Sequence, residues 1–201
     1  MSGAELEAAR DRGLRFRVQI RGLLCEGEYT SETKTTLLIA YVDIALEHHE
    51  AVALLIKSKL YGSAFALTRP LFETVFRALW INCASHDQIE KAARNDNKFP
   101  PIGDIVATID DRYSTDNFFT SIKRKSWTAM CSYVHSGLLQ TARRFTDNTV
   151  KSSYSNIELL EVLNATNTAI ILLGRMFFMS LQWTEQAAIV EKMLTGDHSP
   201  A

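Results

Sequence analysis

The chain has 201 residues, of which 46% are apolar and 22% are charged, a composition that excludes an intrinsically disordered protein. Its formal net charge of −1 excludes a strong overall attraction to nucleic acid or membranes, so an RNA site has to be a local basic cluster. Residues 1–13 contain no apolar segment of the kind found in secretory signals. The three cysteines are isolated in the sequence, which predicts a reduced, cytoplasmic protein without disulfides or a paired-cysteine zinc site.

Almost the whole chain has the pattern of helices, and we expect residues 1–201 to form a single helical domain. Only four prolines occur, and no segment alternates apolar and polar residues for long. The expected helices cover about residues 4–25, 31–58, 64–84, 86–95, 102–111, 116–136 and 156–183, and a last short helix ends at Gly196. Residues 1–27 are expected to form an N-terminal helical arm, and residues 197–201 a frayed tail. Residues 94–104 are predicted to be a loop that serves as a hinge or lid, and residues 146–155 a polar connection.

Local signals mark the starts of several helices. Ser85 with Gln88, and Ser155 with Glu158, have the spacing of capping boxes, in which each side chain bonds to the other residue's backbone. Pro70 is expected in the first two turns of its helix, where a proline costs least.

These elements predict an all-α protein, an antiparallel helical bundle with three to four long core helices plus short helices. The longest apolar run, residues 169–183, is broken by Gly174 and Arg175. It is shorter than the roughly 20 residues that a membrane span needs. We therefore expect a core helix at this position and no membrane partner.

The second expected helix carries Asp43, Glu47 and Glu50 on one stripe, at positions i, i+4 and i+7. Acids beside two histidines favour a di-iron site, but such bundles use a Glu-x-x-His motif that this chain lacks. His48 and Val52 lie on the opposite side of the helix. The pattern therefore predicts a solvated acidic face, an inward-facing His48, and neither a metal nor another cofactor.

The third expected helix combines a charge ladder with aromatic residues. Arg69, Glu73 and Arg77 follow one another at steps of four, and Phe76 and Trp80 lie on the same side. The helix is otherwise apolar nearly all round, which is typical of a buried helix. One interpretation is a structural ion ladder, because a buried charge must be paired. The other is a partly open site for an anionic ligand, with aromatic rings for stacking or cation–π contacts.

His135, in the segment SYVHSG, is the candidate catalytic residue. One interpretation is a hydrogen-bonded histidine in the core. The other is a working group whose partner comes from another helix, with Arg69 or Arg77 best placed. Arg124 shares the stripe of His135, but it lies roughly 16 Å away along an unbroken helix and is too far to cooperate directly.

The long C-terminal helix has a polar stripe within an otherwise apolar segment. Its members are Asn164, Asn167, Thr168, Arg175 and Gln182. Exposure to solvent is the simplest explanation of this stripe. Alternatively, Arg175 enters the bundle, meets Glu73 or an acid of the second helix, and belongs to a ligand site.

The succession LEHHEAVALLIKSKLYGSAFALTRPLFETVFRALW, followed downstream by SYVHSG, resembles a group of uncharacterised bacterial helical proteins related to the HEPN class. The likeness covers about residues 36–183. The resemblance implies a helical bundle that forms a homodimer. Many proteins of that class are metal-independent ribonucleases of toxin–antitoxin, phage-defence or CRISPR systems, and others are scaffolds or nucleotide-binding modules.

Active HEPN proteins carry an arginine, four to six residues and then a histidine. This sequence departs from that motif, because residues 127–133 contain no arginine and His135 has to take its arginine from another helix. We expect a defence- or stress-associated protein that engages RNA or a nucleotide, with His135, Arg69 and Arg77 catalytic and with Glu73, Phe76, Trp80 and Arg175 binding the ligand. The alternatives are a non-catalytic dimeric module with an unidentified protein partner, or a regulator that binds a small anion.

Overall fold

The computed structural model describes residues 3–95, 98–146 and 148–195, and helices hold most of these residues, which confirms the all-α class. The helices are α1 (Gly3–Cys25), α2 (Thr33–Lys57), α3 (Tyr61–Cys83), α4 (His86–Arg94), α5 (Ile102–Tyr113), α6 (Phe118–Val134), α7 (Leu138–Ala142), α8 (Asn156–Ser180) and α9 (Thr184–Thr195). Strands β1 (Phe145–Thr146) and β2 (Thr149–Val150) form a small antiparallel hairpin where a polar connection was expected. The expected end of the last helix at Gly196 and the frayed tail lie outside the described residues.

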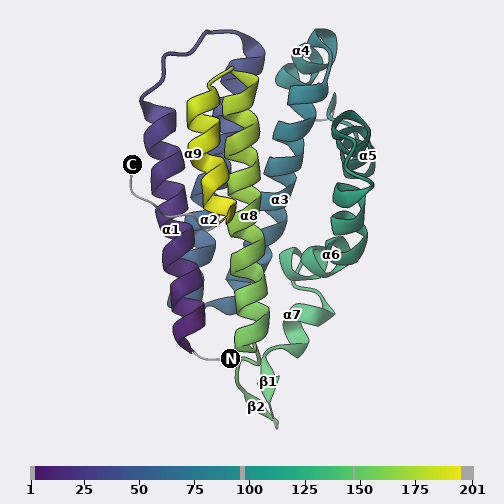
Figure 1. The fold of residues 1–201 in the computed structure, drawn as a ribbon. Helices are drawn as coiled ribbons and strands as arrows, with labels where there is room; N and C mark the ends of the chain where they lie inside the picture. The colour runs from purple at the N-terminus through teal and green to yellow at the C-terminus, as the bar shows by residue number, and fades with distance from the viewer. Residues whose placement is uncertain (1–2, 96–97, 147, 196–201) are drawn as a thin grey trace.

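Four long helices, α1, α2, α3 and α8, form the body of the molecule, and α9 folds back along α8 (Figure 1). In Figure 1, α1, α3 and α8 run upward and α9 runs downward. Neighbours along the chain in the body are therefore antiparallel, whereas α8 runs parallel to α1 and α3. Helices α5 and α6 lie beside α3, away from α1.

The buried face of α2 shows why it packs in the middle of the body. Its buried residues recur at steps of three and four, the period of a helix with one apolar face: Leu38, Val42, Ala45, Leu46, His49, Val52, Ala53 and Ile56. His49, at 1% exposure, belongs to this face, and His48 is only partly buried. The prediction of an inward-facing His48 was therefore wrong by one residue, which is a rotation of 100° about the helix.

The segment expected to form an N-terminal arm packs against α8 and α2 as helix α1. Phe16, Ile20 and Leu24 of α1 are buried in the main core. Two acids of α2 reach across to α1: Asp43 lies 3.1 Å from Arg21, and Glu50 forms an ion pair with Arg17. The acidic stripe of α2 thus contacts α1 and is not simply a solvated face.

Helix α3 begins three residues earlier than expected, at Tyr61, so Pro70 lies in its interior and not in its first two turns. The carbonyl of Pro70 accepts a bond from the Thr74 hydroxyl at 2.8 Å. α3 packs against α2 and α5, and Leu71, Phe76 and Ile81 are at 1% exposure or less. Because α3 is buried in this way, its charge ladder is held in a fixed position on the body of the molecule.

Both ends of α6 are held by specific hydrogen bonds. At the start, the buried carboxylate of Asp110 accepts from the backbone N–H of Phe119 at 2.9 Å and of Thr120 at 2.8 Å. Burial raises the pKa of Asp110, but its hydrogen bonds outweigh this effect and lower the pKa below its usual value. At the other end, Gly137 N–H bonds to the Ser132 carbonyl, and Ser136 between them is left-handed (φ 52°), a Schellman-type ending.

The predicted capping boxes are both present. Ser85 and Gln88 cap α4, and Ser155 and Glu158 cap α8, with the side chain of each partner bonded to the backbone of the other. In α8, Glu158 also forms an ion pair with Arg143, which ties the segment after α7 to the start of the last long helix.

Helix α8 is long and apolar enough to cross a membrane by length and composition, with a mean hydropathy of 1.4 over its most apolar window. A central helix of a bundle has the same pattern, and α8 packs against α1, α2, α3 and α9. This finding is weak evidence for a membrane span.

Candidate functional site

The ladder predicted on α3 is an ion-paired row on the surface of the body. Arg77 Nη2 lies 3.1 Å from Glu73 Oε1, and Arg69 Nε lies 3.9 Å from Glu73 Oε2. The three side chains keep between 23% and 29% of their exposure, so the row is neither buried nor free in solvent. Two guanidinium groups share one carboxylate, which leaves one positive charge uncompensated within the row.

An aromatic ring covers each guanidinium. The Arg69 Cζ lies 5.2 Å from the centre of the Trp127 ring of α6, and the Arg77 Cζ lies 4.7 Å from the centre of the Phe99 ring in the α4–α5 connection. Such contacts hold a cation in a fixed position through the negative face of the ring. They also cover one face of each guanidinium and leave its edge to form hydrogen bonds.

His135 lies beside Arg69 although the two residues are 66 positions apart in the sequence. Arg69 Nη1 is 3.2 Å from His135 Nε2. Arg69 has only donors, so Nε2 is the acceptor in this bond and the imidazole carries its proton on Nδ1. His135 caps the C-terminus of α6 and is exposed, so the prediction of a core histidine was wrong.

The ladder keeps unused hydrogen-bonding capacity. Among the described residues, the Nε atoms of Arg69 and Arg77 are buried and have no hydrogen-bond partner. A buried donor without a partner carries a desolvation cost, which an anionic ligand that reaches it would relieve. Arg69, His135 and Arg77 therefore form a positively charged row with free donors and one histidine acceptor.

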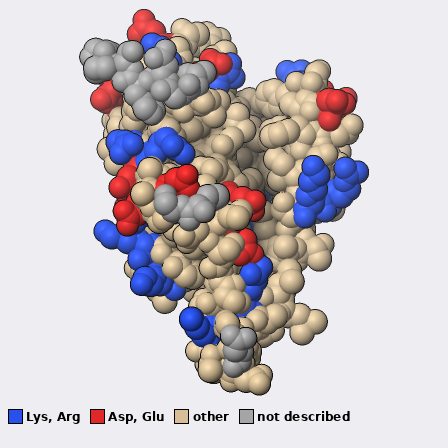
Figure 2. Space-filling view, turned by 60° about the horizontal axis from the view of Figure 1, so that its bottom comes forward, with Lys and Arg blue, Asp and Glu red and all other residues tan. Residues whose placement is uncertain are grey.

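Basic side chains also gather next to this row. Figure 2 shows a group of Lys and Arg residues on the lobe at the right, where α5 and α6 lie in Figure 1. Helix α6 contributes the consecutive residues Lys123, Arg124 and Lys125, of which Arg124 and Lys125 are exposed. The overall charge of −1 thus hides a local basic surface on α6.

Phe76 and Trp80, predicted to contact a ligand, lie beneath the ladder. They are 1% and 2% exposed. Phe76 stacks under Trp127, with ring centres 6.2 Å apart, and Trp80 contacts Phe99 at 5.5 Å. They support the two rings that cover the guanidinium groups and do not present their own faces to solvent.

Arg175 is not part of this cluster. Its Nε lies 3.3 Å from Glu191 of α9, and both side chains are largely exposed, at 40% and 54%. Arg175 therefore joins α8 to α9, and it pairs with neither Glu73 nor an acid of α2.

A second polar cluster lies inside the body, between α1, α2 and α8. His49 Nε2 and Asn167 Oδ1 are 2.7 Å apart, and Asn167 Nδ2 donates to the Ala9 carbonyl at 3.1 Å. Asn167 is 4% exposed, so the solvent explanation of the polar stripe on α8 was wrong for this residue. Burial lowers the pKa of His49, because the interior disfavours the charged imidazolium.

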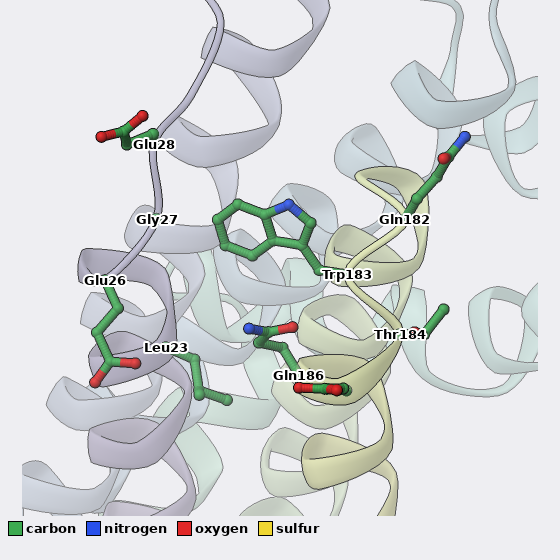
Figure 3. Close-up of a pocket in the computed structure, with 9 residues that line it drawn as sticks. Leu23, Glu26, Gly27, Glu28, Gln182, Trp183, Thr184 and Gln186 are labelled. Carbon is green, nitrogen blue, oxygen red and sulfur yellow. The ribbon is translucent and has the colours of Figure 1, made fainter.

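Figure 3 shows a different hollow, of about 390 Å³, between the α1–α2 connection and the α8–α9 turn. The Trp183 ring stacks on Tyr29, with ring centres 5.4 Å apart, and it fills the space in front of Gly27. A Cβ atom at Gly27 would lie 2.0 Å from the Trp183 ring, so only glycine fits there. The lining includes Glu26, Glu28 and Glu185 and no basic residue, which makes this hollow unsuited to a phosphate.

Within the described part of the chain, no group of three or more His, Cys, Asp or Glu residues is arranged to hold a metal ion.

Sequence reasoning missed Trp127 and Phe99 as partners of the two arginines, and it missed the cap that Asp110 provides for α6. Trp127 lies eight residues before His135, slightly more than two helical turns, and this spacing was a usable signal. Phe99 lies in a loop, and no periodic pattern places it over Arg77.

Comparisons with known proteins identify the family of this chain but indicate no activity. No curated protein and no solved structure gives a significant match to the chain. Residues 42–197 match a family of unknown function, DUF6988. This match covers most of the chain, from the middle of α2 through α9, and it includes the whole ladder and His135. The chain therefore belongs to the DUF6988 family of unknown function.

Proposed function

We propose that this protein is a HEPN-like helical bundle that binds RNA at the Arg69–His135 pair and cleaves it without a metal. The observation that carries the proposal is the 3.2 Å contact between Arg69 Nη1 and His135 Nε2 on an exposed surface. Arginine binds phosphate through paired donors, and histidine is the side chain best suited to proton transfer near neutral pH. The pair supplies on two helices the groups that active HEPN proteins carry on one.

The resting contact has to open when a phosphate binds. Arg69 then turns its donors to the phosphate oxygens, and the Nε2 lone pair of His135 becomes free to accept a proton. Trp127 limits the movement of Arg69, because its ring lies over the guanidinium. Arg77 is eight residues further along α3, about 12 Å, which suits a contact to a neighbouring phosphate.

In the proposed reaction, His135 Nε2 takes the proton of a ribose 2′-hydroxyl, and its oxygen forms a bond to the adjacent phosphorus. The bond between phosphorus and the 5′ oxygen breaks, and that oxygen takes a proton from water. The imidazolium returns its proton to the hydroxide, which restores the enzyme. The products are a 2′,3′-cyclic phosphate and a 5′-hydroxyl, and acid–base help of this kind contributes about 10²–10⁴-fold.

The proposal also covers the setting of the protein: a cytoplasmic, defence- or stress-associated function in which RNA reaches the site over the basic surface of α6. Phosphate contacts from Lys123 and Arg124 make such binding dependent on salt and not on sequence.

The test is incubation of the purified protein with RNA in the presence of a chelator, beside Arg69→Ala and His135→Ala variants that melt as the wild type does. We expect cleavage with cyclic-phosphate ends by the wild type only, and no cleavage when the 2′-hydroxyls are replaced by hydrogen. If the wild type binds RNA without cleaving it, and Arg69→Ala abolishes this binding, the ribonuclease activity is rejected. The protein would then be a regulator that binds an anion or a nucleotide. Absence of both binding and cleavage would reject the site.

A second candidate function is a dimeric interaction module, and a separate observation favours it. Three large apolar side chains around α7 and the hairpin are widely exposed: Leu138 at 85%, Val150 at 84% and Phe145 at 59%. Clustered exposed apolar residues mark interaction surfaces. Sedimentation is expected to give twice the chain mass of 22.6 kDa, and the variant Leu138→Asp with Val150→Asp to give the single mass. The exposed Val18→Asp on α1 is the control, and a monomeric wild type would reject the homodimer.

A further inference from the structure

A groove runs between α6 and α8, with α3 as its floor. It consists of two hollows of about 410 Å³ and 380 Å³ that share Phe72 of α3, Ser126 and Met130 of α6, and Ala165 of α8. Each hollow lies within the roughly 300–1,000 Å³ of small-molecule sites. The shared residues make the two hollows one continuous site.

The groove exists because the facing side chains are small and α6 is held elsewhere. Helix α6 packs against α3 and α5. Across the gap, α8 presents Ala165, Thr168 and Ala169, and α6 presents Ser126 and Ala129. These short side chains leave space between α6 and α8 above Phe72 of α3, which is itself only 8% exposed.

Polarity changes along the groove. The 410 Å³ hollow is lined by apolar and small neutral polar side chains, with no charged residue among the described ones. The 380 Å³ hollow adds Lys125 and Arg143 with Glu158 and Glu161. Arg143 and Glu158 form an ion pair with each other. Lys125 on the α6 wall and Glu161 on the α8 wall form no ion pair within the described part of the chain.

We propose that this groove binds a single-chain amphiphile with a zwitterionic head group. The aliphatic chain lies in the uncharged hollow over Phe72 and Phe76, where burial of each methylene is favourable. An anionic group of the head pairs with Lys125, and a cationic group pairs with Glu161 on the opposite wall. One free cation and one free anion at the same end of an apolar groove match such a head group better than a head of a single charge.

The amphiphile site is independent of the ribonuclease proposal. On α6, the groove is lined by Ile122, Ser126, Met130 and Tyr133, which fall on one stripe of the helix. His135 belongs to the stripe that lies about 180° away, as residues 126 and 135 are nine positions apart. The two sites therefore use opposite faces of the same helix.

The test is calorimetric titration of the full chain with octyl-, decyl- and dodecylphosphocholine, each below its critical micelle concentration. We expect one site per chain and affinity that rises about fourfold per added methylene. Ala165→Phe, an exposed position shared by both hollows, is expected to lower the affinity at least tenfold. The matched control is Ala188→Phe, at an exposed position on α9, which is expected to bind as the wild type does.

Head-group recognition is tested with Lys125→Ala and Glu161→Gln. Each variant is expected to lower the affinity for decylphosphocholine but not the affinity for decanol. Ser126→Phe fills the groove from the opposite wall and replaces Ala165→Phe if that variant fails to fold. The proposal is overturned if no saturable binding occurs, if both filled variants bind normally, or if the groove is covered by a second copy of the chain in solution. Binding to phosphatidylcholine vesicles with no binding of free single-chain probes would also overturn it, because it would point to a bilayer surface.

Discussion

Two histidines of this chain show how differently the same residue is used in two regions. His49 lies in the interior between α1, α2 and α8, where it meets Asn167 and no ionised partner at hydrogen-bond distance. His135 lies on the surface where α6 ends, beside Arg69 and within a row of three charged residues. The first contact joins neutral groups out of water, and the second joins a cation to an acceptor that solvent can reach.

The comparison indicates which region can change its contacts. Removing one member of the interior cluster leaves a buried polar atom without a partner, so the cost falls on folding. Opening the Arg69–His135 contact exposes both groups to water or ligand, so its cost is small. We therefore assign the interior cluster to stability, whereas the proposed function uses the surface pair for binding and catalysis.

The largest expected effect concerns His135. His135→Ala is expected to lower the rate of RNA cleavage by about 10²–10⁴-fold. Because the side chain is exposed, the free energy of unfolding is expected to change by no more than about 0.5 kcal/mol. Cleavage assays and urea denaturation measure the two effects, and exposed His86→Ala on α4 is the control. A large loss of stability in His135→Ala would show that His135 also stabilises the fold, and it would contradict the difference between the two regions.

Asn167→Ala is expected to show the opposite behaviour. It leaves the buried His49 N–H without a partner and removes a bond to the Ala9 carbonyl, at a cost of about 1–3 kcal/mol in the free energy of unfolding. Asn164→Ala, an exposed position on the same helix, is the matched control and should change it by less than about 0.5 kcal/mol. Equal denaturation midpoints for the two variants would contradict the structural role of Asn167.

The interior cluster also makes stability dependent on pH. Burial lowers the pKa of His49 below its ordinary value of 6.5, so the unfolded chain binds a proton at a higher pH than the folded chain does. The contribution of neutral His49 to stability is therefore fully present above its ordinary pKa of 6.5 and is lost as the pH falls below that value. Urea denaturation at several pH values measures this slope, which His49→Gln is expected to reduce. Asp110 and Glu158, whose pKa values are also lowered, lose their contribution at lower pH, since their ordinary values are 3.8 and 4.5.

The smallest expected effect is that of Arg175. Its ion pair with Glu191 is solvent-exposed, and such pairs contribute less than about 1 kcal/mol. Arg175→Ala should melt close to the wild type and cleave RNA at the same rate. A strong loss of cleavage would show that Arg175 belongs to the site, as the sequence allowed.

Much of the fold followed from local patterns. The long helices, both capping boxes and the all-α class were predicted close to their observed positions, since each depends on residues within a few turns of one another. The errors arose where neighbouring positions compete. A shift of one position decides whether His48 or His49 points inward. Asn167 was expected to be exposed, but it is buried because α1 and α2 pack against α8.

Local sequence patterns were enough to predict the helices, their caps and the row Arg69–Glu73–Arg77, because helical spacing puts residues four apart on one face. The partners of these residues depend instead on how the helices pack. The contacts of Arg69 with His135 and of His49 with Asn167 span 66 and 118 positions. Such contacts depend on how whole helices pack, and helix packing is the sum of many small side-chain contacts that no local pattern records.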